Sequence, residues 1–255
     1  MYHVGKIIRK TLASPSVMVL DLNVPGLTSF LPGQWVDFVV PPHQWIGGFS
    51  IASSPRELPK LTLAIKKSNH SAATWVHEQS QVDQEVHVQV GGTCVLPPLD
   101  TTILSPSPRI FSAGGIGISP ILSQYREFLS QRAILTSSKA PGPATRLFYS
   151  VSQQSELIFG DELARLAKQA KETHAEDQMI FSLTQAKHWD PAAESTFGDA
   201  VELKVGRAMK EFLHDVPQDS IFYLCGPPGM LDEMVEHLVQ SRNVQPSNIH
   251  YEKWW

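Results

Sequence analysis

The first hundred residues contain short runs of apolar and β-branched residues, separated by turns rich in Pro, Gly, Asn and Asp. Several runs alternate apolar with polar positions, which is typical of strands with one buried face. Only residues 72–79 show a helical pattern among them. Closely spaced strands without intervening helices predict an antiparallel β-barrel. The expected strands are residues 4–8, 17–24, 34–40, 49–52, 61–67 and 85–90.

The pattern changes after the Ser/Pro loop at residues 105–108. Strand-like runs now alternate with longer runs whose apolar residues recur every three or four positions, and this alternation predicts a doubly wound parallel α/β sheet. The sequence therefore predicts two domains, a barrel over residues 1–104 and an α/β domain over residues 105–255. Two polar insertions, 136–143 and 187–195, are interpreted as surface loops. Strand and helix pairs are expected at 110–113 and 120–129, 146–151 and 161–170, 179–183 and 207–213, and 221–225 and 230–240, with a last strand at 249–252.

Composition and charge narrow the class of protein. The 255 residues carry 21 Lys and Arg against 25 Asp and Glu, a formal net charge of −4, so a nucleic acid partner is not expected. No apolar run is long enough to predict a transmembrane segment. Charges within residues 2–12 argue against a signal peptide. Two distant cysteines, Cys94 and Cys225, are too few for an iron–sulfur cluster or a structural zinc, so a reduced, intracellular soluble protein without a metal site is expected.

The segment from Arg109 to Pro120 combines a predicted strand, a glycine-rich turn and the start of a predicted helix. Glycines let the backbone approach a bulky anion, and the amides at a helix start bind phosphate. A dinucleotide pyrophosphate is the anion that best suits such a turn, although many glycine-rich turns between strand and helix are only turns. The residues expected to bind it are Gly114, Gly115, Gly117, Ile118, Ser119 and Pro120.

A second motif, Cys225-Gly-Pro-Pro-Gly-Met230, follows the apolar run 221–224 and precedes an amphipathic helix. Taken alone, Cys225 is interpreted as a small buried thiol, the commonest situation of an unpaired cysteine. A barrel followed by an α/β domain with both motifs in this order resembles the ferredoxin–NADP reductase superfamily over nearly the whole chain. The resemblance implies that this turn lies beside the nicotinamide, where hydride passes to a flavin. It implies nucleotide binding by Cys225, Gly226, Pro227, Gly229 and Met230.

The C-terminal segment, residues 249–255, adds a third match, because many members of the superfamily end a strand with Glu, one spacer and an aromatic residue. The resemblance implies that Glu252 lies near the flavin N5 edge and that Trp254 covers the flavin ring. A terminal aromatic anchor packed on the barrel is the alternative for Trp254. Segments 33–38, 47–51, 53–55, 68–70 and 75–77 also resemble a smaller family known chiefly by its sequence, which implies a flavin-type reductase without fixing its substrate.

The flavin motif of the superfamily, Arg-x-Tyr-Ser/Thr, corresponds here to Gly47, Phe49 and Ser50. The ring and the hydroxyl are kept, but the arginine that pairs with the flavin phosphate is absent. A phosphate–guanidinium contact contributes roughly 1.5–3 kcal/mol, so its loss weakens binding by about one to two orders of magnitude unless another cation replaces it. The candidates for that cation are Lys66, Lys67 and Arg56, and the expected flavin-binding residues of this segment are Gly48, Phe49, Ser50 and Ile51.

Residues 71–75 take the place of the second flavin-phosphate element. The Thr74 hydroxyl and the amides of Ala73 and Thr74 are expected to bind the phosphate at the helix start. An ordinary Ser or Thr cap on a short helix is the alternative. Residues 149–156, where NADP-specific members carry a cation, contain no cation and one acid, which predicts NADH over NADPH unless Lys187 or Arg207 folds in.

The expected function is that of a flavin-dependent NAD(P)H oxidoreductase. Hydride passes from the nicotinamide to FAD, or alternatively FMN, and electrons then pass to an external acceptor such as a redox protein. Ser50, Cys225 and Glu252 are the expected catalytic residues. One alternative is a non-catalytic nucleotide-binding or scaffold protein with a degenerate flavin site, and another is a component reductase that works only with its acceptor. The resemblance implies a mitochondrial location, with a cytoplasmic one as the alternative.

Overall fold

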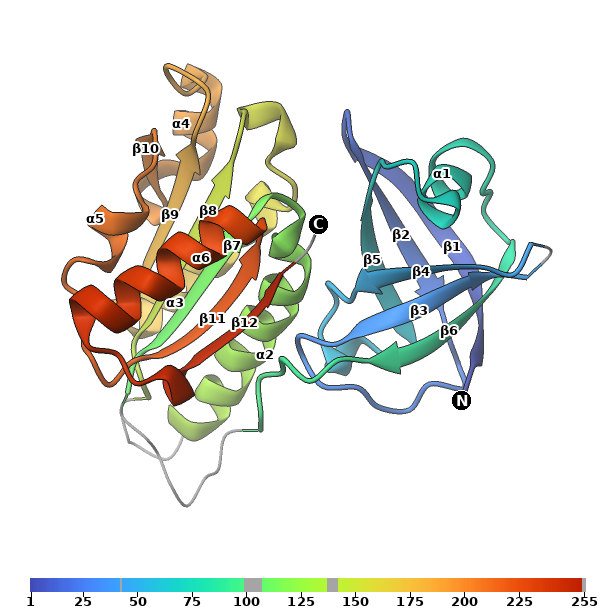
Figure 1. Cartoon of the computed structure of the whole chain (residues 1–255), viewed down its shortest axis with the longest axis horizontal. Coiled ribbons are helices and arrows are strands. Elements are labelled where there is room, and N and C mark those ends of the chain that lie inside the picture. Colours follow the sequence, from blue (N-terminus) through green and yellow to red (C-terminus); the bar gives the residue numbers. More distant parts are fainter. Residues whose placement is uncertain (42, 99–106, 137–141, 254–255) are drawn as a thin grey trace.

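The computed structural model describes residues 1–41, 43–98, 107–136 and 142–253. Within these residues an antiparallel six-stranded sheet is followed by a parallel six-stranded sheet with helices on both faces, as the sequence predicts (Figure 1). The predicted domain boundary, between residues 104 and 105, lies outside the described residues. No helix in the described part of the chain is long and apolar enough to cross a membrane.

The N-terminal sheet has the strand order β4-β3-β6-β1-β2-β5. A bridge between Ile51, which directly follows β4, and Leu63, in the middle of β5, joins the two outer strands. The sheet therefore closes as a barrel around a core that includes Ile7, Leu20 and Phe38. The predicted helix is confirmed as α1, which packs on β3, β4 and β5. The elements are β1 (His3–Ser14), β2 (Val17–Asn23), β3 (Trp35–Val40), β4 (Trp45–Ser50), β5 (Lys60–Lys66), α1 (Ser71–Glu78) and β6 (Glu85–Gly91).

One predicted strand of the barrel is shifted. We expected a strand at residues 49–52, but β4 begins at Trp45 and ends at Ser50. Gly47 and Gly48 lie within this strand and pair in register with Phe38 and Asp37 of β3. Gly47 is tolerated inside the strand because the Phe49 ring fills the space beside it.

The second sheet has the parallel order β10-β9-β8-β7-β11-β12, so the chain reverses its direction of winding between β7 and β11. Ligands of doubly wound sheets bind at this switch point, beyond the carboxyl ends of the strands. Both sequence motifs directly follow the two strands concerned. The elements are β7 (Arg109–Gly114), α2 (Ile118–Thr136), β8 (Thr145–Val151), α3 (Gly160–Thr173), β9 (Gln178–Leu183), α4 (Pro191–Phe197), β10 (Glu202–Val205), α5 (Met209–Leu213), β11 (Ile221–Gly226), α6 (Pro228–Glu236) and β12 (Ile249–Lys253).

The interpretation of residues 187–195 as a loop is wrong. Asp190 caps α4 by accepting a hydrogen bond from the Ala192 amide, and Pro191 takes the first helical position. Trp189 is 5% exposed, and its indole N–H donates to the carbonyl of Lys204 in β10, a strand that the sequence did not predict. Strand β10 alternates charged and apolar residues over only four positions, which is too short for a periodicity signal. Residues 137–141 of the other expected loop lie outside the described residues.

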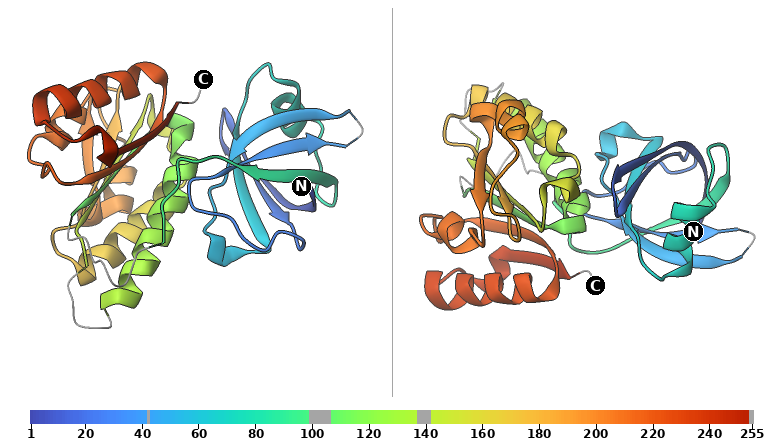
Figure 2. Two further views of the ribbon diagram at one scale, coloured as in Figure 1. Left: turned by 60° about the horizontal axis from the view of Figure 1, so that its bottom comes forward. Right: turned by 90° about the horizontal axis from the view of Figure 1, so that it is seen from above.

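Helix α2 lies between the parallel sheet and the barrel (Figures 1 and 2). Its Ser123 hydroxyl donates to the carbonyl of Ser53 at 2.6 Å. Its Arg126 guanidinium donates to the carbonyl of Ala52 and pairs with Glu57 of the barrel and with Glu162 of α3. Helix α2 thus fixes the barrel against the α/β domain through directed polar contacts.

Apolar contacts reinforce this interface. Val17, Val19, Ala64 and Leu96 from the barrel side belong to the same buried cluster as the face of the parallel sheet that α2 and α3 cover. A separate cluster, which includes residues of α5 and α6, covers the other face. The barrel is therefore held on one face of the parallel sheet, next to the start of α2 (Figure 2).

Candidate functional site

The two glycine-containing turns meet at the switch point of the parallel sheet. Strand β11 pairs with β7 so that Cys225 lies opposite Ala113. A Cβ atom on Gly226 would lie 3.1 Å from the backbone nitrogen of Gly114, and one on Gly117 would lie 2.4 Å from the Cys225 carbonyl oxygen. The turns therefore pack backbone against backbone, which only glycine allows at this distance.

This packing gives Gly114 and Gly117 a structural role at the contact between the turns. We expected Gly114, Gly115 and Gly117 to open the backbone to an anion. A Cβ on Gly114 would lie 2.6 Å from the Met230 sulfur, so this glycine and Gly117 serve the contact between the turns. Gly115 has φ +54° and faces open space, as does Gly229 at the start of α6. The open backbone at the ends of β7 and β11 is thus confined to these two positions among the predicted glycines.

Cys225 and Glu252 are neighbours in register on the adjacent parallel strands β11 and β12. The Cys225 side chain is 2% exposed and packs in the core beneath α2. Glu252 is half-buried, and its charge contributes, after burial, to raising the pKa of the Cys94 thiol to about 12. The Cys94 thiol is therefore protonated at neutral pH. Trp254 lies outside the described residues.

Aromatic residues surround this pair, and the sequence did not single them out. The Tyr223 ring stacks on Phe111 at 5.4 Å and on His250 at 5.2 Å. Burial, followed by the charge of Arg109, lowers the pKa of His250. The pairing register of β7, β11 and β12 brings these residues together. This register depends on contacts between distant segments, so no local sequence pattern predicts it.

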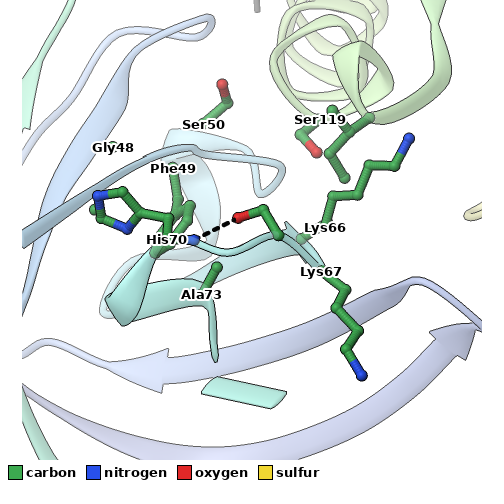
Figure 3. Close-up of a pocket in the computed structure, with 12 residues that line it drawn as sticks. Gly48, Phe49, Ser50, Lys66, Lys67, His70, Ala73 and Ser119 are labelled. Carbon is green, nitrogen blue, oxygen red and sulfur yellow. Dashed lines mark hydrogen bonds between the residues drawn. The ribbon is translucent and has the colours of Figure 1, made fainter. Parts of the chain in front are cut away.

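A cavity of about 350 Å³ lies between the barrel and the start of α2 (Figure 3). One of the three predicted catalytic residues, Ser50, lines it, whereas Cys225 and Glu252 do not. The cavity wall contains one aromatic ring, three hydroxyls, one imidazole and two ammonium groups, and no carboxylate. Its lining is Gly47, Gly48, Phe49, Ser50, Ala64, Lys66, Lys67, Ser68, His70, Ala73, Ile116 and Ser119.

The remaining predicted residues lie around this cavity or at the turns. Ile51 and Ile118 are fully buried in the two domain cores. Pro120 lies in the first turn of α2, and Pro227 precedes α6, in which Met230 lies.

Position 47 has no space for a side chain. A Cβ on Gly47 would lie 2.7 Å from the Phe49 ring and 3.0 Å from the Ala72 Cβ. The Phe49 ring is itself fixed by an edge contact with Phe38 at 5.6 Å. An arginine at position 47 would therefore require the ring of Phe49 to move.

Of the three cations that could replace the missing arginine, one is held in an ion pair outside the cavity and two line the cavity. Arg56 is excluded, because its guanidinium forms a bidentate pair with Glu127 of α2. Lys66 and Lys67 are exposed and line the cavity. In the part of the chain that the structure describes, no carboxylate forms an ion pair with either lysine. The end of β5 therefore carries two cations without local compensation.

The expectation for the Thr74 amide is wrong. This amide donates to the His70 carbonyl at 2.9 Å, and the Thr74 hydroxyl donates to the Ser68 carbonyl at 3.2 Å. Thr74 does not line the cavity, whereas Ala73 does. Because the bond from Thr74 is the first of the helix, the amides of residues 71–73 have no acceptor within it. The amides at the start of α1 without an acceptor in the helix therefore include that of Ala73 and exclude that of Thr74.

Ser119 provides a further observation at the cavity. Its side chain is 1% exposed, and its hydroxyl has no hydrogen-bond partner among the described residues. A buried polar group without a partner costs about 1–3 kcal/mol, so such groups mark positions where a ligand or water completes the bonding. Sequence analysis placed Ser119 in a pyrophosphate turn, and the structure places it on the wall shared with Ser50 and Phe49.

Comparisons with known proteins agree with this architecture. Residues 111–236 match the family model described as oxidoreductase NAD-binding domain. Oxidoreductase NAD-binding domain-containing protein 1 of Bos taurus is 36% identical over 249 residues, which cover 95% of this chain and 77% of that protein.

Solved structures share the fold at low identity. The flavohaemoglobin-like FAD/NAD-binding domain of nitric oxide dioxygenase from Vibrio cholerae is 18% identical, with a TM-score of 0.74 over 99% of this chain and 98% of that one. Ferredoxin–NADP⁺ reductase from Plasmodium falciparum is 17% identical, with a TM-score of 0.73 over 99% of this chain and 96% of that one. The fold is therefore that of the ferredoxin–NADP reductases.

Proposed function

We propose that this chain, which belongs to the family of oxidoreductase NAD-binding domain-containing protein 1, is a flavin-dependent NAD(P)H oxidoreductase. Residues 1–104 would form the flavin-binding domain and residues 105–255 the nicotinamide-binding domain. The observation that carries the proposal is the cavity between the barrel and α2, which combines the Phe49 ring with the hydroxyls of Ser50 and Ser119 and with two lysines. This combination fits a ligand that has a flat aromatic part, polar edges and an anionic group.

The residues present fit a flavin, FAD or FMN. Phe49 offers a half-buried ring for packing against an aromatic plane. The unpartnered Ser119 hydroxyl and the Ser50 hydroxyl offer hydrogen bonds to the polar edges of the ring system. A bound flavin supplies what side chains lack, a group that accepts hydride and releases electrons singly. The protein supplies orientation and excludes water from the reacting atoms.

The nicotinamide nucleotide is the substrate, and its proposed place is the switch point. Gly115 and Gly229 leave the backbone open at the ends of β7 and β11. The Cys225–Gly226 turn forms the wall between them, and we propose that Cys225 and Glu252 border the nicotinamide. We propose NADH as the donor. Arg207 is 85% exposed and lies 3.8 Å from Glu233, and Lys187 is also exposed, so these two residues are the candidates for binding a 2′-phosphate if NADPH were the donor.

The proposed acceptor of the electrons is an external redox protein. The neighbour from Plasmodium falciparum carries ferredoxin in its name, and the fold is shared over the full length of this chain. We propose a small electron-transfer protein of this type as the partner. A mitochondrial location stays a prediction from resemblance.

Absorbance of the purified protein with and without added FAD or FMN tests the proposal. We expect a flavin band that NADH bleaches faster than NADPH in stopped-flow mixing. A protein that takes up neither flavin, and that oxidises no NADH with an artificial dye, would contradict the reductase activity. That result would favour the alternative of a non-catalytic nucleotide-binding or scaffold protein. The observation that supports this alternative is the Phe49 ring, which fills the space beside Gly47 that the usual flavin-binding arginine would need.

A further inference from the structure

The cavity wall has an imbalance of charge. Lys66 and Lys67 lie side by side at the end of β5, and the cavity lining contains no Asp or Glu. At the opposite end of the same strand, Lys60 pairs with Glu57 at 2.7 Å. Two neighbouring ammonium groups repel each other, and an anionic ligand removes that repulsion. The lining therefore selects for a ligand with negative charge.

Lys66 and Lys67 leave the chain in different directions, and both line the cavity. In Figure 3 the Lys66 side chain extends toward the start of α2, where Ser119 lies, and the Lys67 side chain points to the other side of the strand. Ser68 and His70, which precede α1, line the same cavity. The amides of the first turn of α1 add a partial positive charge there. Cations, hydroxyls and helix amides thus surround one end of the cavity.

The cavity wall at Gly47 has no room for a cationic side chain. The Phe49 ring and Ala72 occupy the space that a side chain on Gly47 would need. Arg56 is held by Glu127. Among the described residues that line the cavity, the ammonium groups are those of Lys66, the last residue of β5, and Lys67, which follows it.

We propose that Lys66 and Lys67 bind the phosphate of the flavin nucleotide, so that the end of β5 supplies the charge that position 47 does not hold. This inference rests on the proposed flavin dependence. Lysine binds phosphate as a point charge, without the bidentate geometry of arginine. The site therefore requires a phosphate group on the ligand, but the phosphate can take slightly different positions relative to the two ammonium groups.

Three probes of the same ring system test this assignment: FAD, FMN and riboflavin, which lacks the phosphate. Their dissociation constants are measured by flavin fluorescence in the intact protein and in the double variant Lys66→Gln/Lys67→Gln. We expect binding of FAD and FMN to weaken by about 10- to 100-fold in the double variant, with riboflavin changed less than about twofold. The control is Lys168→Gln on α3, an exposed lysine that does not line the cavity, and it leaves all three constants unchanged.

The outcomes separate this inference from the proposed function. Intact protein that binds no flavin contradicts both. Intact protein that binds FMN and riboflavin equally well, or a double variant that loses neither FAD nor FMN, overturns the assignment of Lys66 and Lys67 alone. Equilibrium dialysis measures NADH binding to the intact protein and to the double variant. Weakened NADH binding with unchanged flavin binding would assign the lysines to the nicotinamide nucleotide instead and overturn the inference.

Discussion

Gly117 lies so close to the carbonyl of Cys225 that a Cβ atom on it would be 2.4 Å from that oxygen. The two residues belong to turns that are more than a hundred positions apart in the chain, and each turn ends a strand at the switch point of the sheet. The first glycine turn thus packs against the second, and Gly115 and Gly229 beside them face open space.

Gly117→Ala is expected to destabilise the protein. Its Cβ would meet backbone atoms, which cannot move aside as a flexible side chain does, so we expect a loss of about 1–3 kcal/mol in the free energy of unfolding. Gly229→Ala is the matched control, because nothing lies within 4 Å of its added Cβ and it begins a helix. Chemical denaturation of both variants measures the difference. Equal stabilities would contradict the close contact.

Arg126→Met is expected to loosen the two domains. The side chain is 17% exposed, and its removal takes one ion-pair partner from Glu57, one from Glu162 and the guanidinium donor from the Ala52 carbonyl. We expect a loss of about 2–4 kcal/mol in unfolding free energy and a larger radius of gyration in small-angle scattering. Arg165→Met, which removes a 67% exposed arginine 3.9 Å from the same Glu162, should cost at most about 0.5 kcal/mol. A similar loss in both variants would argue against the role of Arg126 between the domains.

His250 predicts a pH dependence of stability. Burial first, and Arg109 second, lower its pKa below the usual 6.5. The unfolded chain then binds a proton more readily than the folded one, so this contribution to stability is complete above pH 6.5 and is lost as the pH falls through the lowered pKa. His250→Phe keeps a ring for stacking on Tyr223 without a titrating group. Unfolding free energies between pH 5 and pH 8 should vary less in this variant, and an unchanged profile would contradict the prediction.

Cys225→Ala tests the proposed hydride site. If the turn positions the nicotinamide as proposed, the rate of flavin reduction by NADH falls by at least about tenfold in this variant, while the dissociation constant of the flavin changes less than about twofold. Cys94→Ala is the control, because its thiol is protonated at neutral pH and it lies outside the turn. Stopped-flow kinetics and flavin fluorescence give the two quantities. Equal effects on rate and binding would reject the role of Cys225.

Much of this architecture was predictable, because strands, helices and turns follow local periodicity. The alternating runs before residue 100 and the βα pairs after it predicted the barrel, the parallel sheet and α1. Strand β1 extends to Ser14 and helix α2 to Thr136, well beyond the predicted ends at residues 8 and 129. Strand β4 was predicted with shifted bounds, and strand β10 and helix α4 were not predicted. Glycine is uncommon inside strands, and Gly47 fits within β4 because the Phe49 ring fills the space beside it. Helix α4 has only 7 residues, too few for a helical periodicity signal.

The candidate site was predictable only in part. The sequence by itself determined the two turns, the position of Ser50 and the absence of an arginine at position 47, since these are properties of residue identity and order. It left three cations open, and the structure decided between them, because Arg56 lies against Glu127 of α2 while Lys66 and Lys67 line the cavity. The structure also placed Gly117 against Cys225 and left the Ser119 hydroxyl without a hydrogen-bond partner among the described residues. These relationships join residues far apart in the chain, and the packing of the barrel on α2 and the register of β7, β11 and β12 create them, so only the tertiary structure decides them.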